Sequence, residues 1–375
     1  MKKISANIMV FNEERCIKRC IDSLLKFVDE IIIIDTGSSD NTIEIINSYK
    51  LEIIKLYKFP WNNSFSEIRN KMISLSTKDI IFQIDADEYL DSNQNLIKLK
   101  KNLIETLNSS QALSPMIIDY SGTGYSGTLS RIFLNNNNFY YFGLIHEELR
   151  NNQINFLKNK FNLKIIHDGY LEEVLISKNK STRNIALSKK MINIEPSNLR
   201  WHYFLIKDLF YYGNNTSILI KEVNKLIKKI NSQEKDEYLS RMLQEIETLK
   251  LYSKITQGNV CNKEIERFKI NFNCTDVNFL KLLNLKLKFR LLQEEIYDCL
   301  NSFYLVKNFK DSFFNDTGDH IRYILCEFLE MFQDFENFKI NFNNLNPHVK
   351  NTYSNKQLEF LEEITNFIKK TKGGT

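Results

Sequence analysis

The sequence has few of the residues that break or cross-link a fold. Its 375 residues include only 4 Pro, 11 Gly and 6 Cys. So little proline and glycine excludes a collagen-like or low-complexity chain. The cysteines, at positions 16, 20, 261, 274, 299 and 326, match no zinc or redox spacing. A long chain with few cysteines and no disulfide framework is typical of a reducing compartment.

Long apolar runs and a large excess of one charge are also missing. The densest apolar run, residues 31–34, is far shorter than the ~18 residues of a membrane-spanning helix. The N-terminal residues include no apolar stretch of the kind found in signal peptides. The net charge is only +5, whereas nucleic-acid-binding domains usually carry a strongly basic surface. We therefore expect a cytoplasmic protein that binds neither a membrane nor nucleic acid.

The chain does have enough apolar sequence for more than one domain. Apolar residues make up 43% and aromatic residues 12% of it, which suffices for a sizeable core. Its length exceeds that of a usual single domain. Residues 1–175 alternate strand and helix patterns, and residues 176–375 are helical in pattern. We predict an α/β domain followed by an all-α domain, with the boundary near residue 175.

The first half has the pattern of a parallel, doubly wound sheet, because strands and helices alternate as in βαβ units. The predicted strands are 4–10, 30–34, 52–57 and 79–84, and the predicted helices are 14–27, 40–49, 66–75 and 93–107. Residues 112–120 and 128–134 then predict an antiparallel hairpin around a glycine-rich turn. Two more short strands are predicted at 139–145 and 163–167.

The helical half contains one segment that resembles a tetratricopeptide-type helix pair. It covers residues 195–213, with Trp201 and Gly213 near the positions that such pairs favour. No clean second copy follows at a ~34-residue period, so a degenerate TPR-like array is the expectation. We expect this half to bind an acceptor or to mediate dimerisation.

Polar side chains follow three of the predicted parallel strands. In an open parallel sheet, ligands bind at the carboxyl ends of the strands. Two carboxylates two residues apart can hold a hard divalent cation, which would neutralise a diphosphate leaving group. Ordinary loop and helix-cap chemistry is the alternative interpretation for any one of these stretches. The polar side chains concerned are Asn12 and Glu13 after the first strand, where Phe11 precedes them, Asp35 and Thr36 after the second, and Asp85 and Asp87 after the fourth.

These stretches resemble the family 2 glycosyltransferases of the GT-A fold, a Rossmann-like, mostly parallel sheet. A narrower resemblance, to the peptide S-glycosyltransferases of glycocin biosynthesis, is carried by residues 61–70, 142–148, 167–170, 180–187 and 195–201. The resemblance implies an inverting hexosyltransferase with a UDP-sugar donor, either UDP-glucose or UDP-GlcNAc. The implied acceptor is a cysteine of a bacteriocin precursor peptide.

The resemblance also implies a set of donor-binding residues. Phe11 would stack on the uracil, and Asp35 and Thr36 would bond to its edge. Asp85 would reach the ribose, and Arg69 would either pair with a donor phosphate or hold Asp85. The full implied set is Phe11, Asn12, Glu13, Asp35, Thr36, Arg69 and Asp85.

Four further residues receive roles in metal binding and catalysis by the same resemblance. Asp87 and His167 would hold Mn²⁺ or Mg²⁺, since imidazole accepts manganese well. An inverting transfer needs a base to take the acceptor's proton, and Glu147 is the candidate. His146 would orient Glu147 or contact a donor phosphate.

Two other functions stay open at this stage. A family 2 enzyme with the same donor could act on Ser or Thr, or on a surface saccharide. Alternatively, the helices could form a peptide scaffold beside a vestigial nucleotide site, although the intact pair Asp85 and Asp87 argues against this. A homodimer is a further expectation that the sequence does not decide.

Overall fold

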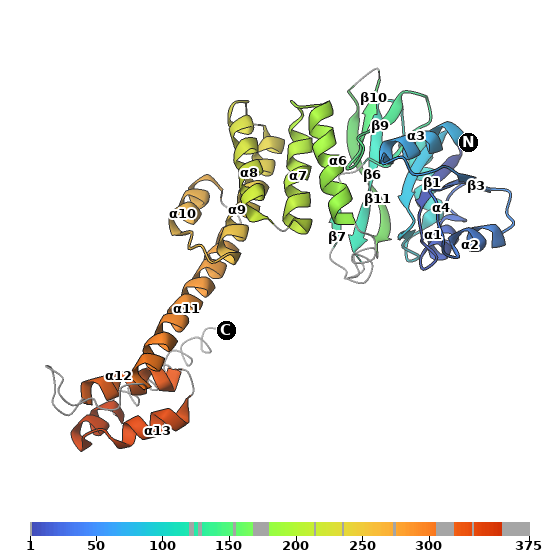
Figure 1. Cartoon of the computed structure of the whole chain (residues 1–375). Helices are drawn as coiled ribbons and strands as arrows, with labels where there is room; N and C mark the ends of the chain where they lie inside the picture. Colours follow the sequence, from blue (N-terminus) through green and yellow to red (C-terminus); the bar gives the residue numbers. More distant parts are fainter. Residues whose placement is uncertain are drawn as a thin grey trace. The chain divides into compact units, whose positions relative to one another are not determined.

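The computed structural model describes residues 2–119, 124–126, 130–152, 155–167, 180–213, 215–234, 236–272, 275–304, 319–331 and 334–354 (Figure 1). The chain divides into two compact units, Met1–Ser253 and Lys254–Thr375. The two units are separated by how densely their residues contact one another. The predicted boundary near residue 175 is instead the point where the strand and helix pattern gives way to helices alone. That predicted boundary falls in residues 168–179, outside the described part of the chain, and stays a prediction.

The first part of the sheet is parallel, as predicted. Its strands run in the order β3-β2-β1-β4, and every neighbouring pair is parallel. The strands are β1 (Ile4–Val10), β2 (Glu30–Asp35), β3 (Ile54–Lys58) and β4 (Ile80–Asp85). The connecting helices are α1 (Ile17–Leu24), α2 (Thr42–Ser48) and α3 (Phe65–Leu75).

Both faces of this parallel part are covered by helices. Ile31 and Ile33 of β2 pack into the core that includes the apolar side of α1, while Ile32 and Ile34 pack on α3. All four isoleucine side chains are fully buried. A strand buried on both sides explains why its sequence is continuously apolar rather than alternating.

The second part of the sheet is mixed. The order continues β4-β8-β6-β11-β5, in which only β6 and β11 are parallel neighbours among the described strands. These strands are β5 (Glu88–Leu90), β6 (Gln111–Asp119), β7 (Gly124–Ser126, beside β6), β8 (Ile132–Leu134) and β11 (Leu157–His167). A separate pair consists of β9 (Phe139–Phe142) and β10 (Glu148–Asn151), and α4 (Leu96–Thr106) follows β5.

The sequence prediction for this part is wrong at three short strands. Residues 124–126 belong to the predicted glycine-rich turn but form β7. Strands β5 and β10 are not predicted from the sequence. All three are three or four residues long, and stretches this short give no measurable period. The predicted pairing of 112–120 with 128–134 is confirmed through the antiparallel contact of β6 with β8.

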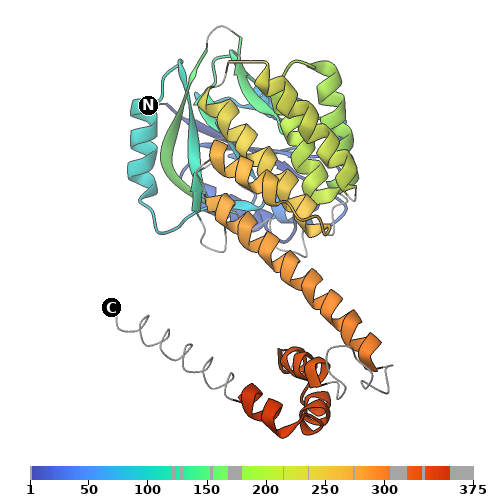
Figure 2. The same cartoon turned by 90° about the vertical axis from the view of Figure 1, so that its left-hand side faces the viewer.

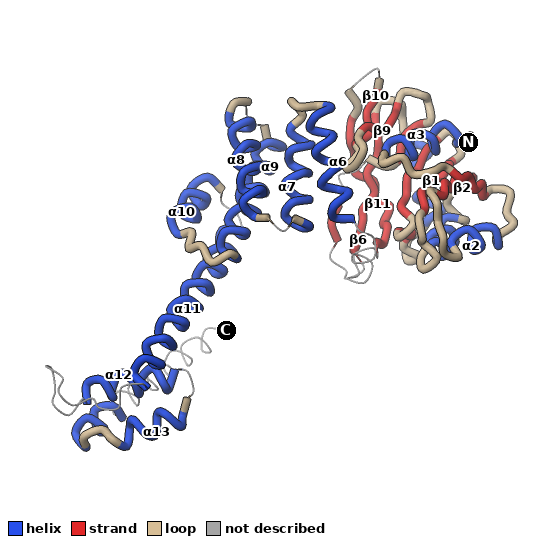
Figure 3. Tube along the Cα trace, viewed as in Figure 1, coloured by secondary structure: helices blue, strands red, loops and turns tan. Residues whose placement is uncertain are grey.

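The rest of the described chain is helical, as predicted (Figure 3). Figures 1 and 2 show α6, α7 and α8 packed side by side in the first unit. None of the helices that the structure describes is long and apolar enough to cross a membrane. The helices are α6 (Lys180–Ile194), α7 (Leu199–Tyr212), α8 (Thr216–Asn231), α9 (Glu237–Thr256), α10 (Asn262–Asn271), α11 (Thr275–Tyr304), α12 (Asp319–Met331) and α13 (Phe335–Asn343).

Candidate active site

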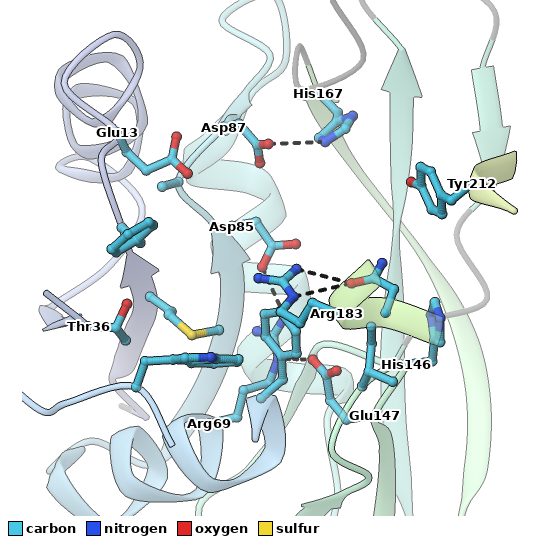
Figure 4. A pocket seen from close by; sticks show the side chains of 17 residues that line it. Glu13, Thr36, Arg69, Asp85, Asp87, His146, Glu147, His167, Arg183 and Tyr212 are labelled. Carbon is cyan, nitrogen blue, oxygen red and sulfur yellow. Dashed lines mark hydrogen bonds and ion pairs between the residues drawn. The ribbon is translucent and has the colours of Figure 1, made fainter. Parts of the chain in front are cut away.

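A cavity of about 490 Å³ lies past the carboxyl ends of β1, β2 and β4 (Figure 4). All of the site residues predicted from the sequence line it, except Asn12 and Asp35. The predicted residues in its wall are Phe11, Glu13, Thr36, Arg69, Asp85, Asp87, His146, Glu147 and His167. The edge of the sheet where ligands were expected is therefore hollowed, and the expected side chains surround the hollow.

Asn12 and Asp35 shape the loops beside this cavity. The Asp35 carboxylate accepts hydrogen bonds from the backbone N–H groups of Gly37 and Ser38 at 3.1 and 3.0 Å. Asn12 has a φ of 53°, and its Oδ1 accepts from the backbone N–H of Ser39 at 2.8 Å. The Asp35 bonds shape the loop after β2, and the Asn12 bond ties the loop after β1 to it. The predicted contacts of both residues with a donor stay predictions.

Two arginines hold Asp85. Nη2 of Arg69, from α3, lies 3.0 Å from Oδ1 of Asp85, and Nη2 of Arg131, which directly precedes β8, lies 3.1 Å from Oδ2. Burial by itself would raise the pKa of the Asp85 carboxyl, but the charges of Arg131 and Arg69 outweigh burial and hold that pKa well below its usual range. Asp85 is therefore ionised at neutral pH, and its predicted contact with the ribose stays a prediction.

Arg131 was not predicted. Its Nη1 also pairs with Glu88, and both side chains are almost fully buried. Burial raises the pKa of the Glu88 carboxyl, against the opposing charge of Arg131. The one sequence signal for Arg131 is its place directly before the short apolar strand β8. A charged residue at such a place is expected to be buried, and a buried arginine needs a carboxylate partner.

Arg69 also joins Asp85 to the predicted base. Its Nε lies 2.5 Å from Oε1 of Glu147, so one guanidinium bridges two carboxylates from distant parts of the chain. The Arg69 side chain is only 11% exposed. Figure 4 shows both interactions at one side of the cavity. The bond to Arg69 engages Oε1 of Glu147, and the role of Glu147 as a base stays a prediction.

Asp87 and His167 meet at the other side. Oδ2 of Asp87 lies 3.6 Å from Nε2 of His167 (Figure 4). Burial lowers the pKa of the His167 imidazole, but the hydrogen bond and charge of Asp87 outweigh burial, so the net shift is upward. Within the described ranges no three His, Cys, Asp or Glu side chains gather as a metal cage. One carboxylate and one imidazole nevertheless fit a divalent cation whose remaining ligands are phosphate oxygens and water.

Aromatic side chains and one arginine line a further side of the cavity. Trp61 and Phe65 meet edge to face with ring centroids 4.7 Å apart. The guanidinium carbon of Arg183, from α6, lies 5.3 Å from the centre of the Phe65 ring. Asn184 and Tyr212 also line this side. The sequence stretches containing Trp61 and Arg183 supported the family resemblance, but no role was predicted for either residue.

His146 lies in the cavity wall with an unusual backbone. Its φ is 51°, in the left-handed region. Its Nε2 lies 3.1 Å from both carboxylate oxygens of Asp208 on α7. The ring nitrogen that remains for a ligand is therefore Nδ1. Asp208 was not predicted, since nothing in the sequence of α7 marks it as a partner of the cavity.

Residues 5–171 match the family model described as glycosyl transferase family 2. This part of the chain is therefore a family 2 glycosyltransferase domain, and the predicted family is confirmed. Its sheet, parallel in the N-terminal part from β3 to β4, is followed by a largely helical region, which agrees with the predicted GT-A-like architecture.

Individual relatives cover only part of the chain. It is 34% identical over 240 residues to the SPbeta prophage-derived glycosyltransferase SunS of Bacillus subtilis, covering 62% of this chain and 54% of SunS. The match thus spans about half the length of SunS. The chain is also 32% identical over 138 residues to a TPR repeat-containing protein of Synechococcus elongatus, covering 36% of this chain and 32% of that protein.

Among solved structures, the chain is similar to S. aureus TarS 1-349 in complex with UDP-GlcNAc. The sequence identity is 13% and the TM-score is 0.41. The superposition covers 76% of this chain and 91% of the TarS chain.

Proposed function

We propose that this protein is an inverting, metal-dependent glycosyltransferase that moves a hexose from a UDP-sugar to a cysteine of a glycocin precursor peptide. The observation that supports it most is that one cavity contains both halves of such a reaction. Asp87 and His167 lie at one side of it, where the donor diphosphate would bind. Glu147 lies at the other side, where Arg69 joins it to Asp85.

The proposed reaction is a single displacement. The acceptor sulfur attacks the anomeric carbon, and a sulfur–carbon bond forms as the bond from that carbon to the diphosphate oxygen breaks. The thiol proton goes to Oε2 of Glu147, and UDP leaves with the bonding electron pair. A thiol with a reference pKa near 8.5 is already a few per cent ionised at neutral pH, so this base has less to do than with a hydroxyl acceptor.

The leaving diphosphate needs positive charge around it. Asp87 and His167 would hold the divalent cation, which supplies charge neutralisation for the leaving group. Arg183 faces the same cavity, and within the described part of the chain it has no ion pair with a carboxylate. Its guanidinium is thus well suited to bind a phosphate oxygen.

The cysteine acceptor rests on the resemblance of residues 61–70, 142–148, 167–170, 180–187 and 195–201 to the glycocin enzymes. The similarity to SunS is in keeping with it. The aromatic wall of Trp61, Phe65 and Tyr212 offers an apolar surface for residues beside an acceptor cysteine. UDP-glucose and UDP-GlcNAc both remain candidate donors.

The test is to incubate the protein with Mn²⁺, each UDP-sugar and a glycocin precursor, alongside a precursor with the acceptor Cys→Ser. Fragmentation mass spectrometry then locates the sugar. Sugar on the cysteine supports the proposal, and Glu147→Gln should reduce its formation at least tenfold. Glu44→Gln, an exposed carboxylate on α2, is the matched control. Sugar on Ser or Thr while the cysteine stays free would overturn the sulfur acceptor, and sugar transfer to a saccharide only would overturn the peptide acceptor.

We also propose that the predicted homodimer forms through α11. Leu282, Leu285, Phe289 and Leu292 lie three, four and three residues apart, and each side chain is more than half exposed. This spacing is that of a coiled-coil seam. Basic residues gather within 281–290 of α11 and acidic residues within 294–298, while a further acidic residue, Asp276, stands in the first turn: the two groups are Lys281, Lys286, Lys288 and Arg290, then Glu294, Glu295 and Asp298. An antiparallel second copy would bring these opposite charges together.

A further inference from the structure

The segment of residues 143–148, which contains His146 and Glu147, is held largely from the helical part of the first unit. The backbone N–H of Leu144 lies 3.2 Å from Sδ of Met191 on α6. Nη2 of Arg200 on α7 donates to the backbone oxygen of His146 at 2.9 Å. The ring of Trp201, also on α7, lies against Gly143. The two helices therefore contact this segment at several points along its length.

The most specific of these contacts is a buried polar chain from α6 through α7 to His146. Oγ of Ser188 donates to Oδ2 of Asp208 at 2.6 Å, and both residues are almost fully buried, at 1% and 3% exposed. Asp208 in turn lies 3.1 Å from Nε2 of His146. A carboxylate only accepts hydrogen bonds, so Nε2 carries the hydrogen and donates it. In the neutral imidazole this fixes the tautomer of His146 and leaves Nδ1 as the acceptor nitrogen.

The His146 ring is fixed in a second way. It stacks on Phe204 of α7, with centroids 4.2 Å apart and planes 9° apart. A left-handed backbone conformation at a residue other than glycine costs about 1–3 kcal/mol, and such a conformation persists only where the surroundings enforce it. Asp208 and Phe204 are the side chains positioned to enforce it at His146.

A buried carboxylate is also costly unless its partners are in place. Leaving one buried partner of such a network unsatisfied costs about 1–3 kcal/mol, and more for a charged group. The Asp208 carboxylate bonds to one serine, Ser188, and to one histidine, His146. Replacement of Asp208 therefore has its main consequence at His146.

We propose that Asp208, supported by Ser188, is a positioning residue for sugar transfer. It holds the imidazole of His146 with Nδ1 available to the cavity and, through the adjoining peptide, sets the position of Glu147 beside Arg69. The inference rests on the proposed function for its catalytic consequence. Its structural part, that Asp208 holds residues 143–148 in place, does not depend on which acceptor is used.

The kinetic test is a double-mutant cycle with Asp208→Asn and His146→Gln, measured as kcat and KM for the UDP-sugar. Asp208→Asn should lower kcat about tenfold or more with little change in KM, because it disturbs the reacting groups and not the donor site. In the His146→Gln background the same change should cost less than about twofold, since residues that act through one another are not additive. If the kcat of the double variant falls by the product of the two single-variant losses, the two residues act independently and the proposal is overturned.

A control and a milder variant accompany the cycle. Tyr203→Phe changes the same helix at a hydrogen bond to Glu245 of α9 and should leave kcat unchanged. Ser188→Ala should lower kcat by a few-fold without lowering Tm beyond a few degrees. If Asp208→Asn fails to fold, Ser188→Ala and its combination with His146→Gln carry the same test.

Hydrogen exchange of the full-length protein tests the structural part without any substrate. Asp208→Asn should speed exchange of the backbone amides of residues 144–149, and Tyr203→Phe should not. Unchanged exchange in Asp208→Asn would overturn the proposal. If the wild type transfers no sugar to any acceptor, the proposed function fails, while the exchange measurement still decides whether Asp208 holds the segment.

Discussion

Replacement of Gly143 by alanine should destabilise the first unit strongly. Gly143 has a φ of 121°, which a residue with a side chain rarely adopts and which costs about 1–3 kcal/mol. An added Cβ would also lie 2.8 Å from Cη2 of Trp201, 3.2 Å from Cα of Glu147 and 3.2 Å from the backbone oxygen of Ile145. Ordinary carbon contacts are about 3.5–4.0 Å, so something must move.

The tryptophan has little room to move. Trp201 is 1% exposed, and its Nε1 donates to Glu195 at 2.8 Å. Overpacking of this kind costs about 1–3 kcal/mol, so the two effects together amount to about 2–6 kcal/mol. For a unit of this size each kcal/mol lowers Tm by about 2–4 °C. Gly143→Ala should therefore lower Tm by at least about 4 °C, measured by thermal and urea unfolding.

Gly37→Ala is the matched control for this substitution. Gly37 has a φ of 120°, but an added Cβ there would meet nothing within 4 Å. It should therefore show the backbone strain alone, about 1–3 kcal/mol. The difference between the two variants measures the contact with Trp201. If Gly143→Ala is no less stable than Gly37→Ala, the close approach of α7 to residue 143 is not what requires glycine.

Three further outcomes are expected. Asp87→Ala should abolish sugar transfer, and EDTA should stop the wild type until Mn²⁺ or Mg²⁺ is added; full activity in EDTA would remove the metal role of Asp87 and His167. Burial raises the pKa of Glu30, but hydrogen bonds from Lys55, Ser5 and Thr77 outweigh burial and lower that pKa from 4.5 to about 2. Because the folded-state pKa is depressed, Glu30 should contribute about 3 kcal/mol that is fully present above about pH 4.5 and lost as the pH falls towards 2. Glu30→Gln should then be less stable than the wild type at pH 7 but nearly equal at pH 2, by urea unfolding; an equal deficit at both pH values would contradict the cause. Leu285→Glu with Phe289→Glu should convert a dimer to a monomer in light scattering, whereas a wild type that is already monomeric would contradict the role of α11.

The parallel half of the fold could be predicted because its signals are local. The consecutive isoleucines of β2 predict a strand buried on both faces, and the spacing of apolar residues in α1 predicts a helix. The edge that binds ligands follows from the rule for parallel sheets. The meeting of Asp87 with His167 was anticipated through the resemblance, although a bound metal stays a prediction.

The rest of the site could not be predicted, because it depends on pairings between distant residues. Arg131 reaches Asp85 and Glu88 only because β8 lies beside β4. Asp208 and Ser188 lie on different helices, and neither belongs to a motif that marks it as functional. A buried charge is visible in a sequence only when its surroundings are plainly apolar, and α7 mixes polar and aromatic residues throughout.

The contact of α6 and α7 with residues 143–148 has a consequence for recombination between related enzymes. A chimera could join the sheet of one parent to the helices of another at residue 180. Positions 143 and 146 would then come from one parent, and their partners at positions 201 and 208 from the other. Such a crossover would damage the reaction centre even if both parents folded well. A crossover after α8, beyond Asn231, keeps these partners from one parent, so the helices that follow could be exchanged without disturbing residues 143–148.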